Sequence, residues 1–224
     1  MGIKENLEKI KEQIGNHKVK IIAVSKYATH EQTIEAYRLG IRDFGESYVQ
    51  DAIPKLKNLI SQNHEISENK IRWHFIGRLQ NNKIKLVVNC FYLIHSVDSV
   101  ELLNLINKSA SSKGIVQDIL LQVNISQEAS KAGFSSRGLK QDFEKLMKLS
   151  NVNIKGLMTI APKTDDKKMI RSCFKELYDL QEELNENHMT TLKELSMGMT
   201  NDYVEAIECG STMIRIGKGI FANN

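Results

Sequence analysis

The sequence contains little cysteine and no pair of cysteines at CxxC spacing. The three cysteines, Cys90, Cys173 and Cys209, are scattered along the chain, which argues against a disulfide framework and indicates a reducing compartment. The six histidines include no HxH or HxxxH pair, so a metal site has little support. No apolar run has the length of a membrane span, and residues 1–15 lack the apolar centre of a signal peptide. These absences predict a cytoplasmic protein without a membrane partner or a metal.

A strong excess of one charge sign is also missing. The net charge of the 224 residues is only +4, and it is not gathered into the stripe that is typical of nucleic-acid binding. The densest basic segments, 163–168 and 70–72, are interpreted as solvated faces. A module that binds RNA or another protein through a basic rim is kept as an alternative with little support, and we predict no nucleic-acid partner.

The chain does contain a regular alternation of short apolar runs and amphipathic segments. No change in composition marks a linker, so we predict a single domain over residues 1–224. Apolar runs predict strands at 19–26, 41–44, 71–76, 91–95, 115–125, 152–160, 192–196 and 212–217. Helical spacing and cap residues predict helices at 3–14, 29–39, 48–60, 83–88, 99–106, 139–149, 167–185 and 200–209, with residues 45–47 opening the third, and a polar surface loop at 61–69.

Strands separated by helices pair in parallel through right-handed crossovers. Eight such units in a chain of this length predict an α/β protein of the closed (β/α)8 type, a TIM barrel. A doubly wound open sheet is the alternative, but its Gly-rich dinucleotide fingerprint is missing after the first strand. In a closed barrel the first and the eighth strand are neighbours.

Lys26 ends the first apolar run, Val19–Lys26. A lysine at this point can present its amine just beyond the end of a strand. In a partly dry pocket an amine loses its proton more easily and becomes a nucleophile toward aldehydes. The alternative is a lysine that extends into water at a strand end.

The predicted seventh and eighth strands run into glycine-bearing turns, Leu195–Met199 and Gly217–Gly219. Phosphate often binds after these two strands of a barrel. Ser196 can donate a hydroxyl to a phosphate oxygen, and the glycines let backbone N–H groups approach an anion. Alternatively, the glycines only end their strands.

A lysine after strand one and a phosphate cradle after strands seven and eight together suggest pyridoxal 5′-phosphate, whose aldehyde forms a Schiff base with lysine. Arg215 then lies under the pyridine ring. Because arginine carries only donors and stays protonated, it keeps the ring nitrogen unprotonated and makes the ring a weaker electron sink. The alternative for Arg215 is an ion pair with a nearby carboxylate at the rim.

Ten short segments of the chain share a pattern with one known family. They are Ala23–Lys26, Phe44–Glu46, Trp73–Gly77, Leu79–Gln80, His95–Asp98, Gln122–Asn124, Ser130–Phe134, Gly156–Met158, Leu195–Met199 and Glu208–Gly217. In this order, and over nearly the whole chain, they closely resemble the pyridoxal phosphate homeostasis proteins. The resemblance implies a single-domain, alanine-racemase-like barrel of fold type III.

The resemblance also implies roles for individual residues. Lys26 becomes the Schiff-base lysine and Arg215 the partner of the pyridine nitrogen. Phosphate contacts fall to Ser196, Gly217 and the backbone of Lys218, with Ser211 and Thr212 as weaker candidates near that end. Met197 lies beside the proposed cradle and is kept as a candidate contact, although methionines more often serve in packing.

Two positions depart from the family pattern. Ser47 stands where the family usually has asparagine, which puts a contact to the ring oxygen of the cofactor in doubt. Arg78 follows the Trp73–Gly77 segment where proline or histidine is common, and we interpret it as solvated. His74 and His95 are interpreted as hydrogen-bonded structural histidines.

The implied role is storage or delivery of the cofactor without turnover. The chain ends soon after the eighth strand, so we expect no second β-rich domain to close the site, and an open site excludes water poorly. Expected partners are pyridoxal phosphate, other B6 vitamers and apoenzymes that receive the cofactor, for a monomer or weak dimer. The alternative is a low-activity amino-acid racemase that would need Tyr27, Tyr48 or His74 as its opposing acid–base group.

Overall fold

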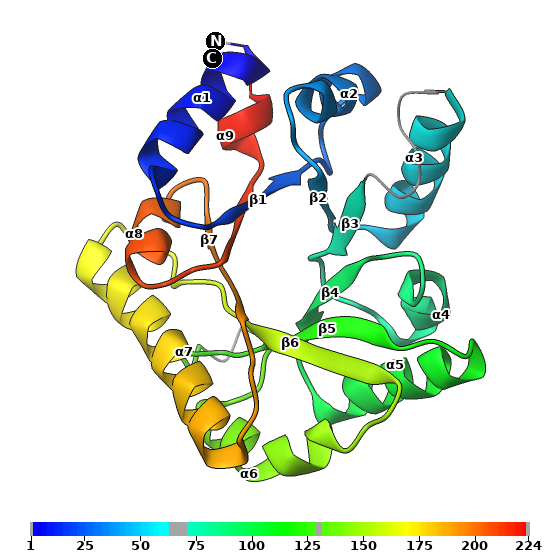
Figure 1. Ribbon diagram of the computed structural model, residues 1–224, viewed down its shortest axis with the longest axis vertical. Helices are drawn as coiled ribbons and strands as arrows, with labels where there is room; N and C mark the ends of the chain where they lie inside the picture. Colours follow the sequence, from blue (N-terminus) through cyan, green and yellow to red (C-terminus); the bar gives the residue numbers. More distant parts are fainter. Residues whose placement is uncertain (1, 63–70, 129–130, 223–224) are drawn as a thin grey trace.

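The computed structural model describes residues 2–62, 71–128 and 131–222. Within these ranges eight parallel strands form a closed barrel in chain order, and the helices lie around its outside (Figure 1). The closed (β/α)8 prediction is therefore confirmed, and the open sheet is not. The strands are β1 (Lys20–Val24), β2 (Asp43–Glu46), β3 (Arg72–Phe75), β4 (Leu93–Val97), β5 (Gln117–Gln122), β6 (Val152–Met158), β7 (Glu194–Met199) and β8 (Met213–Ile216).

Strands β1 and β8 close the barrel. They pair in parallel from Lys20 beside Met213 to Ala23 beside Ile216. All functional groups at the carboxyl ends of the strands therefore share one mouth, and those at the amino ends share the other. We call these the carboxyl mouth and the amino mouth.

The helices follow the predicted order. They are α1 (Ile3–Ile14), α2 (His30–Arg38), α3 (Val49–Gln62), the 3-10 helix η2 (Asn81–Lys83), α4 (Ile84–Val87), α5 (Val100–Ser112), α6 (Ser136–Met147), α7 (Lys167–His188), α8 (Tyr203–Glu208) and α9 (Lys218–Phe221). Thr29 caps α2 by accepting a hydrogen bond from the Gln32 backbone at 3.2 Å, as its sequence position predicted. Helix α9 was not predicted, because its four residues are too few to show a helical period.

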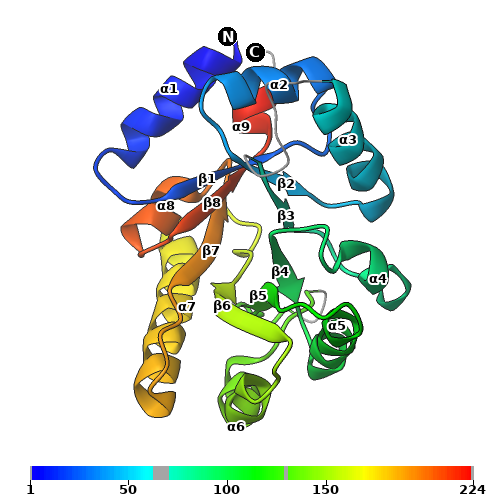
Figure 2. The same cartoon turned by 45° about the vertical axis from the view of Figure 1, so that its right-hand side comes forward.

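The first and last helices lie side by side (Figures 1 and 2). The Asn6 side chain in α1 donates to the carbonyl oxygen of Ile220 in α9 at 3.1 Å. This buried contact holds the segment after β8 against the start of the chain.

The segment Gly45–Ser47 differs from the prediction. It was expected to lie between a strand ending at Phe44 and a helix starting at about Tyr48. The helix starts at Val49, close to that prediction, but Gly45 and Glu46 belong to β2. Gly45 faces the barrel interior, where a Cβ atom would lie 3.0 Å from Ile22 Cγ2 and 3.1 Å from Ile76 Cδ1. Glycine is here a packing requirement of a strand and not a helix start.

The core has two layers. A large layer lies between the sheet and the helices, with Phe44, Phe75, Phe143 and Phe174 fully buried. A small apolar cluster of Ile22, Leu93, Leu120, Met158 and Met213 lies apart from it. Trp73 belongs to the large layer, with its ring centroid 5.4 Å from that of Phe44, so its side chain serves in packing.

Disulfides, metal-ligand clusters and membrane-spanning helices are all absent from the described part of the chain. There, all three cysteines are free, and no cluster of three metal-ligating side chains occurs. No described helix is long and apolar enough to cross a bilayer. Of the loop predicted at 61–69, residues 61–62 continue α3 and the rest lie outside the described ranges.

Candidate functional site

The turns that follow β1 and β8 meet at the carboxyl mouth. Lys26 lies two residues beyond the end of β1, and Gly217 follows β8 directly. A Cβ atom on Gly217 would lie 3.4 Å from Val24 Cβ and 3.5 Å from the Val24 carbonyl oxygen. The predicted neighbourhood of the lysine segment and the Arg215–Gly217 segment is therefore present in the fold.

The side chain of Lys26 is exposed to solvent. Its Nζ lies 5.2 Å from the centre of the Tyr27 ring, which is itself 77% exposed. The partly dry pocket expected around this amine is not formed by the described residues. An amine at this place is open to water and to incoming molecules.

A buried ion pair holds the backbone on either side of Lys26. Lys55 in α3 contacts the carbonyl oxygen of Ser25 and lies 3.4 Å from that of Ala28 and 3.0 Å from Glu46 Oε1. Glu46 is 1% exposed and also accepts a hydrogen bond from the Ser25 hydroxyl at 2.7 Å. The sequence analysis did not identify Lys55, because its position on an amphipathic helix resembles that of any surface lysine.

Arg215 is buried inside the barrel. Its guanidinium donates to Ser196 Oγ at 2.6 Å and to the Thr159 carbonyl oxygen at 3.0 Å. Burial lowers the pKa of Arg215 to about 10, while the charge of Asp202 acts in the opposite direction. The guanidinium thus stays protonated at neutral pH, and among the described residues no carboxylate forms an ion pair with it.

Ser196 lies inside β7 and not at its end. Its hydroxyl is fully buried between Arg215 and His95, 2.8 Å from His95 Nδ1. The strand was predicted to end at Ser196 but continues to Met199. The hydroxyl that stands at the mouth is that of Thr200, which accepts a hydrogen bond from the Gly219 backbone at 3.4 Å.

Thr200 is therefore a candidate that the sequence analysis missed. It is half-buried and joins the turn after β7 to the first turn of α9, where backbone N–H groups lack partners within the helix. Lys218 begins α9 with its side chain exposed. The strand end could have been found from the Met-Gly-Met run, whose alternation continues past Ser196.

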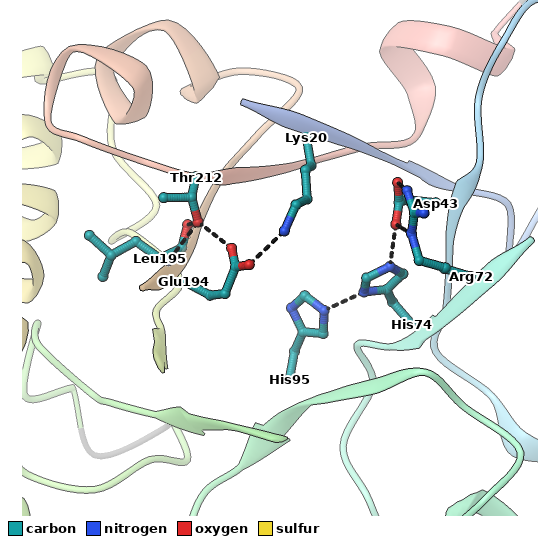
Figure 3. Close-up of polar contacts among 8 residues, drawn as sticks. All are labelled: Lys20, Asp43, Arg72, His74, His95, Glu194, Leu195 and Thr212. Atoms are coloured by element: carbon teal, nitrogen blue, oxygen red, sulfur yellow. Dashed lines mark hydrogen bonds and ion pairs between the residues drawn. The ribbon is translucent and has the colours of Figure 1, made fainter. Parts of the chain in front are cut away.

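Ser211 and Thr212 require a correction. They were expected near the phosphate end, but they precede β8 and lie at its amino end, whereas Gly217 follows it. The Thr212 hydroxyl contacts Glu194 Oε2 at 2.8 Å, and Glu194 pairs with Lys20 at the amino mouth (Figure 3). The direction of the strand separates residues that are close in sequence.

Met197 and Ser47 complete the predicted set. Met197 is fully buried in the layer between sheet and helices, so its side chain packs there as methionines usually do. Ser47 follows β2 at the carboxyl mouth and is half-buried. With the exposed Arg78 it lines a shallow pocket of about 350 Å³, and a Cβ atom on Gly77 would lie 2.0 Å from the Ser47 carbonyl oxygen.

His74 and His95 are both fully buried, and their predicted structural role is confirmed. His74 Nδ1 lies 2.9 Å from His95 Nε2, and His74 Nε2 lies 2.9 Å from Asp43 Oδ1 (Figure 3). Arg72 holds the same carboxylate through two hydrogen bonds of 2.7 and 2.6 Å. Burial alone would raise the pKa of Asp43, but the hydrogen bonds from Arg72 and His74 outweigh it and lower the pKa to about 2.

Burial lowers the pKa of both imidazoles. For His74 the hydrogen bond to Asp43 opposes the shift without reversing it. For His95 burial is reinforced by the charge of Arg215 and by any proton on His74, and the pKa lies well below its usual value. Both rings are therefore neutral at pH 7.

The sequence matches the family described as "Alanine racemase, N-terminal domain" over residues 2–224. It is 37% identical over 219 residues to a "Pyridoxal phosphate homeostasis protein" of Aquifex aeolicus, covering 97% of this chain and 93% of the relative. A protein of the same description from Synechocystis is 39% identical over 205 residues, covering 92% and 91%.

The fold is also similar to those of solved structures. PipY of Synechococcus elongatus, determined with PLP bound, superposes with a TM-score of 0.88 at 34% identity, covering 98% of this chain and all of PipY. Alanine racemase of Clostridium difficile shares the fold with a TM-score of 0.78 at 16% identity, and the match covers 57% of that enzyme.

Proposed function

The chain belongs to the pyridoxal phosphate homeostasis protein family, and we propose that it binds pyridoxal 5′-phosphate at the carboxyl mouth of its barrel. In this proposal Lys26 carries the cofactor as a Schiff base. The observation that carries it is the meeting of the Lys26 segment with the Gly217 turn, across the seam where β1 and β8 pair.

The donor chemistry of the mouth fits a phosphorylated aldehyde. Gly217 has no side chain that would cover the turn beside Val24, and this turn presents backbone N–H groups beside the Thr200 hydroxyl. We assign the phosphate to this place, with Thr200, Gly217 and the Lys218 backbone as its contacts. In this assignment Ser196 is not a phosphate ligand. It accepts a hydrogen bond from Arg215 and so helps to hold the guanidinium in place.

Arg215 is assigned to the ring nitrogen of the cofactor. A guanidinium has donors only, so its partner nitrogen must accept and stay unprotonated. The cofactor supplies an electrophilic aldehyde when bound, and an unprotonated ring stabilises carbanions weakly. This supports a role in holding the cofactor in preference to using it in catalysis.

The exposure of Lys26 supports the same role. An imine on an amine that water and other amines can reach is reversible, which suits storage, exchange with other B6 vitamers and transfer to apoenzymes. We propose these as partners, with no nucleic acid among them, for a monomer or weak dimer in the cytoplasm.

The racemase alternative has less support. It needs a second acid–base group on the opposite face of the substrate carbon. Tyr27 and Tyr48 are 77% and 50% exposed, and both ring nitrogens of His74 are occupied by Asp43 and His95. A weak activity of this type would be detected as racemisation of L-alanine by purified protein.

The decisive experiment is reduction with borohydride. Purified protein incubated with pyridoxal 5′-phosphate should turn yellow, and reduction should fix the phosphopyridoxyl group on Lys26, located by peptide mass spectrometry. An adduct confined to other lysines, or the absence of any adduct, would overturn the proposal. Lys57, which is exposed on the neighbouring helix α3, serves as the internal control for nonspecific labelling.

A further inference from the structure

A continuous column of hydrogen bonds crosses the interior of the barrel. It begins at the amino mouth, where Asp43 starts β2, and ends at the guanidinium of Arg215 in β8. The successive contacts are Asp43 to His74 at 2.9 Å, His74 to His95 at 2.9 Å, His95 to Ser196 at 2.8 Å and Ser196 to Arg215 at 2.6 Å. The column joins side chains from five different strands.

The two ends of the column fix its direction. Arg215 can only donate, and ionised Asp43 can only accept. With neutral histidines, one arrangement satisfies every contact: Arg215 donates to Ser196, Ser196 to His95, His95 to His74, and His74 to Asp43. Each imidazole then carries its proton on Nε2 and accepts at Nδ1.

The column is sealed from solvent. His74, His95 and Ser196 are 0% exposed, so water cannot replace a missing partner. At the amino mouth, Arg72 closes the column by binding the outer side of the Asp43 carboxylate. In such a dry interior, hydrogen bonds polarise one another, and an unmet polar group is costly.

The charge of Arg215 gives the column a physical role. A buried cation needs a compensating charge, yet the direct partners of this guanidinium are a hydroxyl and a carbonyl oxygen. Asp202 acts on it only through space, and the Asp202 carboxylate accepts a hydrogen bond from the Met199 backbone. The carboxylate that a continuous series of side-chain hydrogen bonds connects to Arg215 is Asp43, at the other end of the column.

We propose that Asp43 is the remote counter-ion of Arg215, connected to it by His74, His95 and Ser196. These four are positioning residues: they hold the guanidinium in place and polarise it, but they do not touch the cofactor. The inference rests on the proposed function, because Arg215 is the group through which the column would act on the pyridine nitrogen.

The first test needs no cofactor. In protein labelled with ¹⁵N-histidine, long-range ¹H–¹⁵N NMR at pH 7 should show His74 and His95 neutral, each with its proton on Nε2. A proton on Nδ1 of either ring, or a charged imidazolium, would overturn the column. This result stands or falls independently of cofactor binding, so a failure of the proposed function is distinguishable.

The second test compares three variants at the amino mouth. Asp43→Asn keeps the shape but removes the charge, and should weaken pyridoxal phosphate binding about fivefold, the difference between charged and neutral hydrogen bonds. Arg72→Met leaves the Asp43 charge, and Glu194→Gln breaks the ion pair with Lys20 at the same mouth. Both should bind the cofactor within about twofold of the wild type, a change of roughly 0.4 kcal/mol.

The affinities of the three variants support or overturn the role of Asp43 as counter-ion. Wild-type affinity in Asp43→Asn, or equal weakening in Asp43→Asn and Arg72→Met, would show that the column does not act on the site and would overturn the inference. Circular dichroism melts of all variants establish that the compared proteins are folded at the assay temperature. Weakening in Asp43→Asn alone, together with the two Nε2 protons, supports it.

Discussion

Ile22 of β1 pairs with Arg215 of β8 in the register that closes the barrel. Lys26 lies four residues beyond Ile22 in the same direction, and Gly217 lies two residues beyond Arg215. Because the strands are parallel, the lysine and the glycine turn must emerge at the same mouth, above the buried guanidinium. This register places the turn that carries Lys26 beside the glycine turn after β8.

Lys26→Ala should abolish the covalent adduct completely. Removal of the amine leaves the phosphate and ring contacts, so we expect residual reversible binding without the visible absorption of a lysine-bound cofactor. The measurement is an absorption spectrum followed by borohydride reduction and intact-mass analysis. Lys57→Ala is the matched control and should behave as the wild type, since its side chain is exposed on α3. A full-strength adduct in Lys26→Ala would contradict the assignment.

Thr200→Val should weaken binding of pyridoxal phosphate about tenfold to a hundredfold, the usual effect of losing one hydrogen bond to a charged group. The side chains have nearly the same shape, so the fold should be unaffected. Thr200→Ser restores the hydroxyl and should restore affinity, as measured by equilibrium dialysis. If Thr200→Val binds pyridoxal phosphate normally while Ser196→Ala abolishes recognition of its phosphate group, the phosphate contact belongs to Ser196 and not to Thr200.

Lys55→Met should destabilise the protein and loosen the Lys26 turn. The change leaves the buried Glu46 carboxylate without its cation, which typically costs about 3–5 kcal/mol in a buried pair and roughly the lower figure here because Lys55 is partly exposed. Urea denaturation gives the free energy of unfolding. Hydrogen exchange of the Ala28 amide, which donates to the Ser25 carbonyl oxygen, reports the turn itself. Lys57→Met on the same helix is the control, and equal losses in both variants would refute the role of Lys55.

Acidification below pH 6.5 should destabilise the protein through its buried histidines. The folded-state pKa values of His74 and His95 lie below 6.5, so the unfolded chain binds more protons and stability falls as the pH falls. Each histidine contributes a slope that approaches about 1.4 kcal/mol per pH unit. His95→Gln should remove its share of this slope between pH 6.5 and 5, measured by urea denaturation. His17→Gln, at an exposed histidine, should leave the slope unchanged; an unaltered slope in His95→Gln would contradict the prediction.

The sequence by itself determined the order of the elements and predicted the two ends of the proposed site. Apolar periodicity is a local property, so it located all eight strands and the helices between them, with errors at the strand ends. Closure then followed from the count of units, and it placed β1, which leads to Lys26, beside β8, which carries Arg215. The extension of β7 to Met199 was missed, and with it the position of Thr200 and the true depth of Ser196.

The tertiary structure alone decided what each side chain contacts. Whether a strand residue faces the barrel axis or the helices depends on register, and register joins residues that no local pattern connects. Ser211 and Thr212 were misplaced because strand direction separates them from Gly217. The contact between His95 and Ser196 joins residues that are 101 positions apart. The contacts of Lys55 with Ser25 and Glu46 depend on how α3 lies against β1 and β2. Such contacts arise only when the strands close around a common interior.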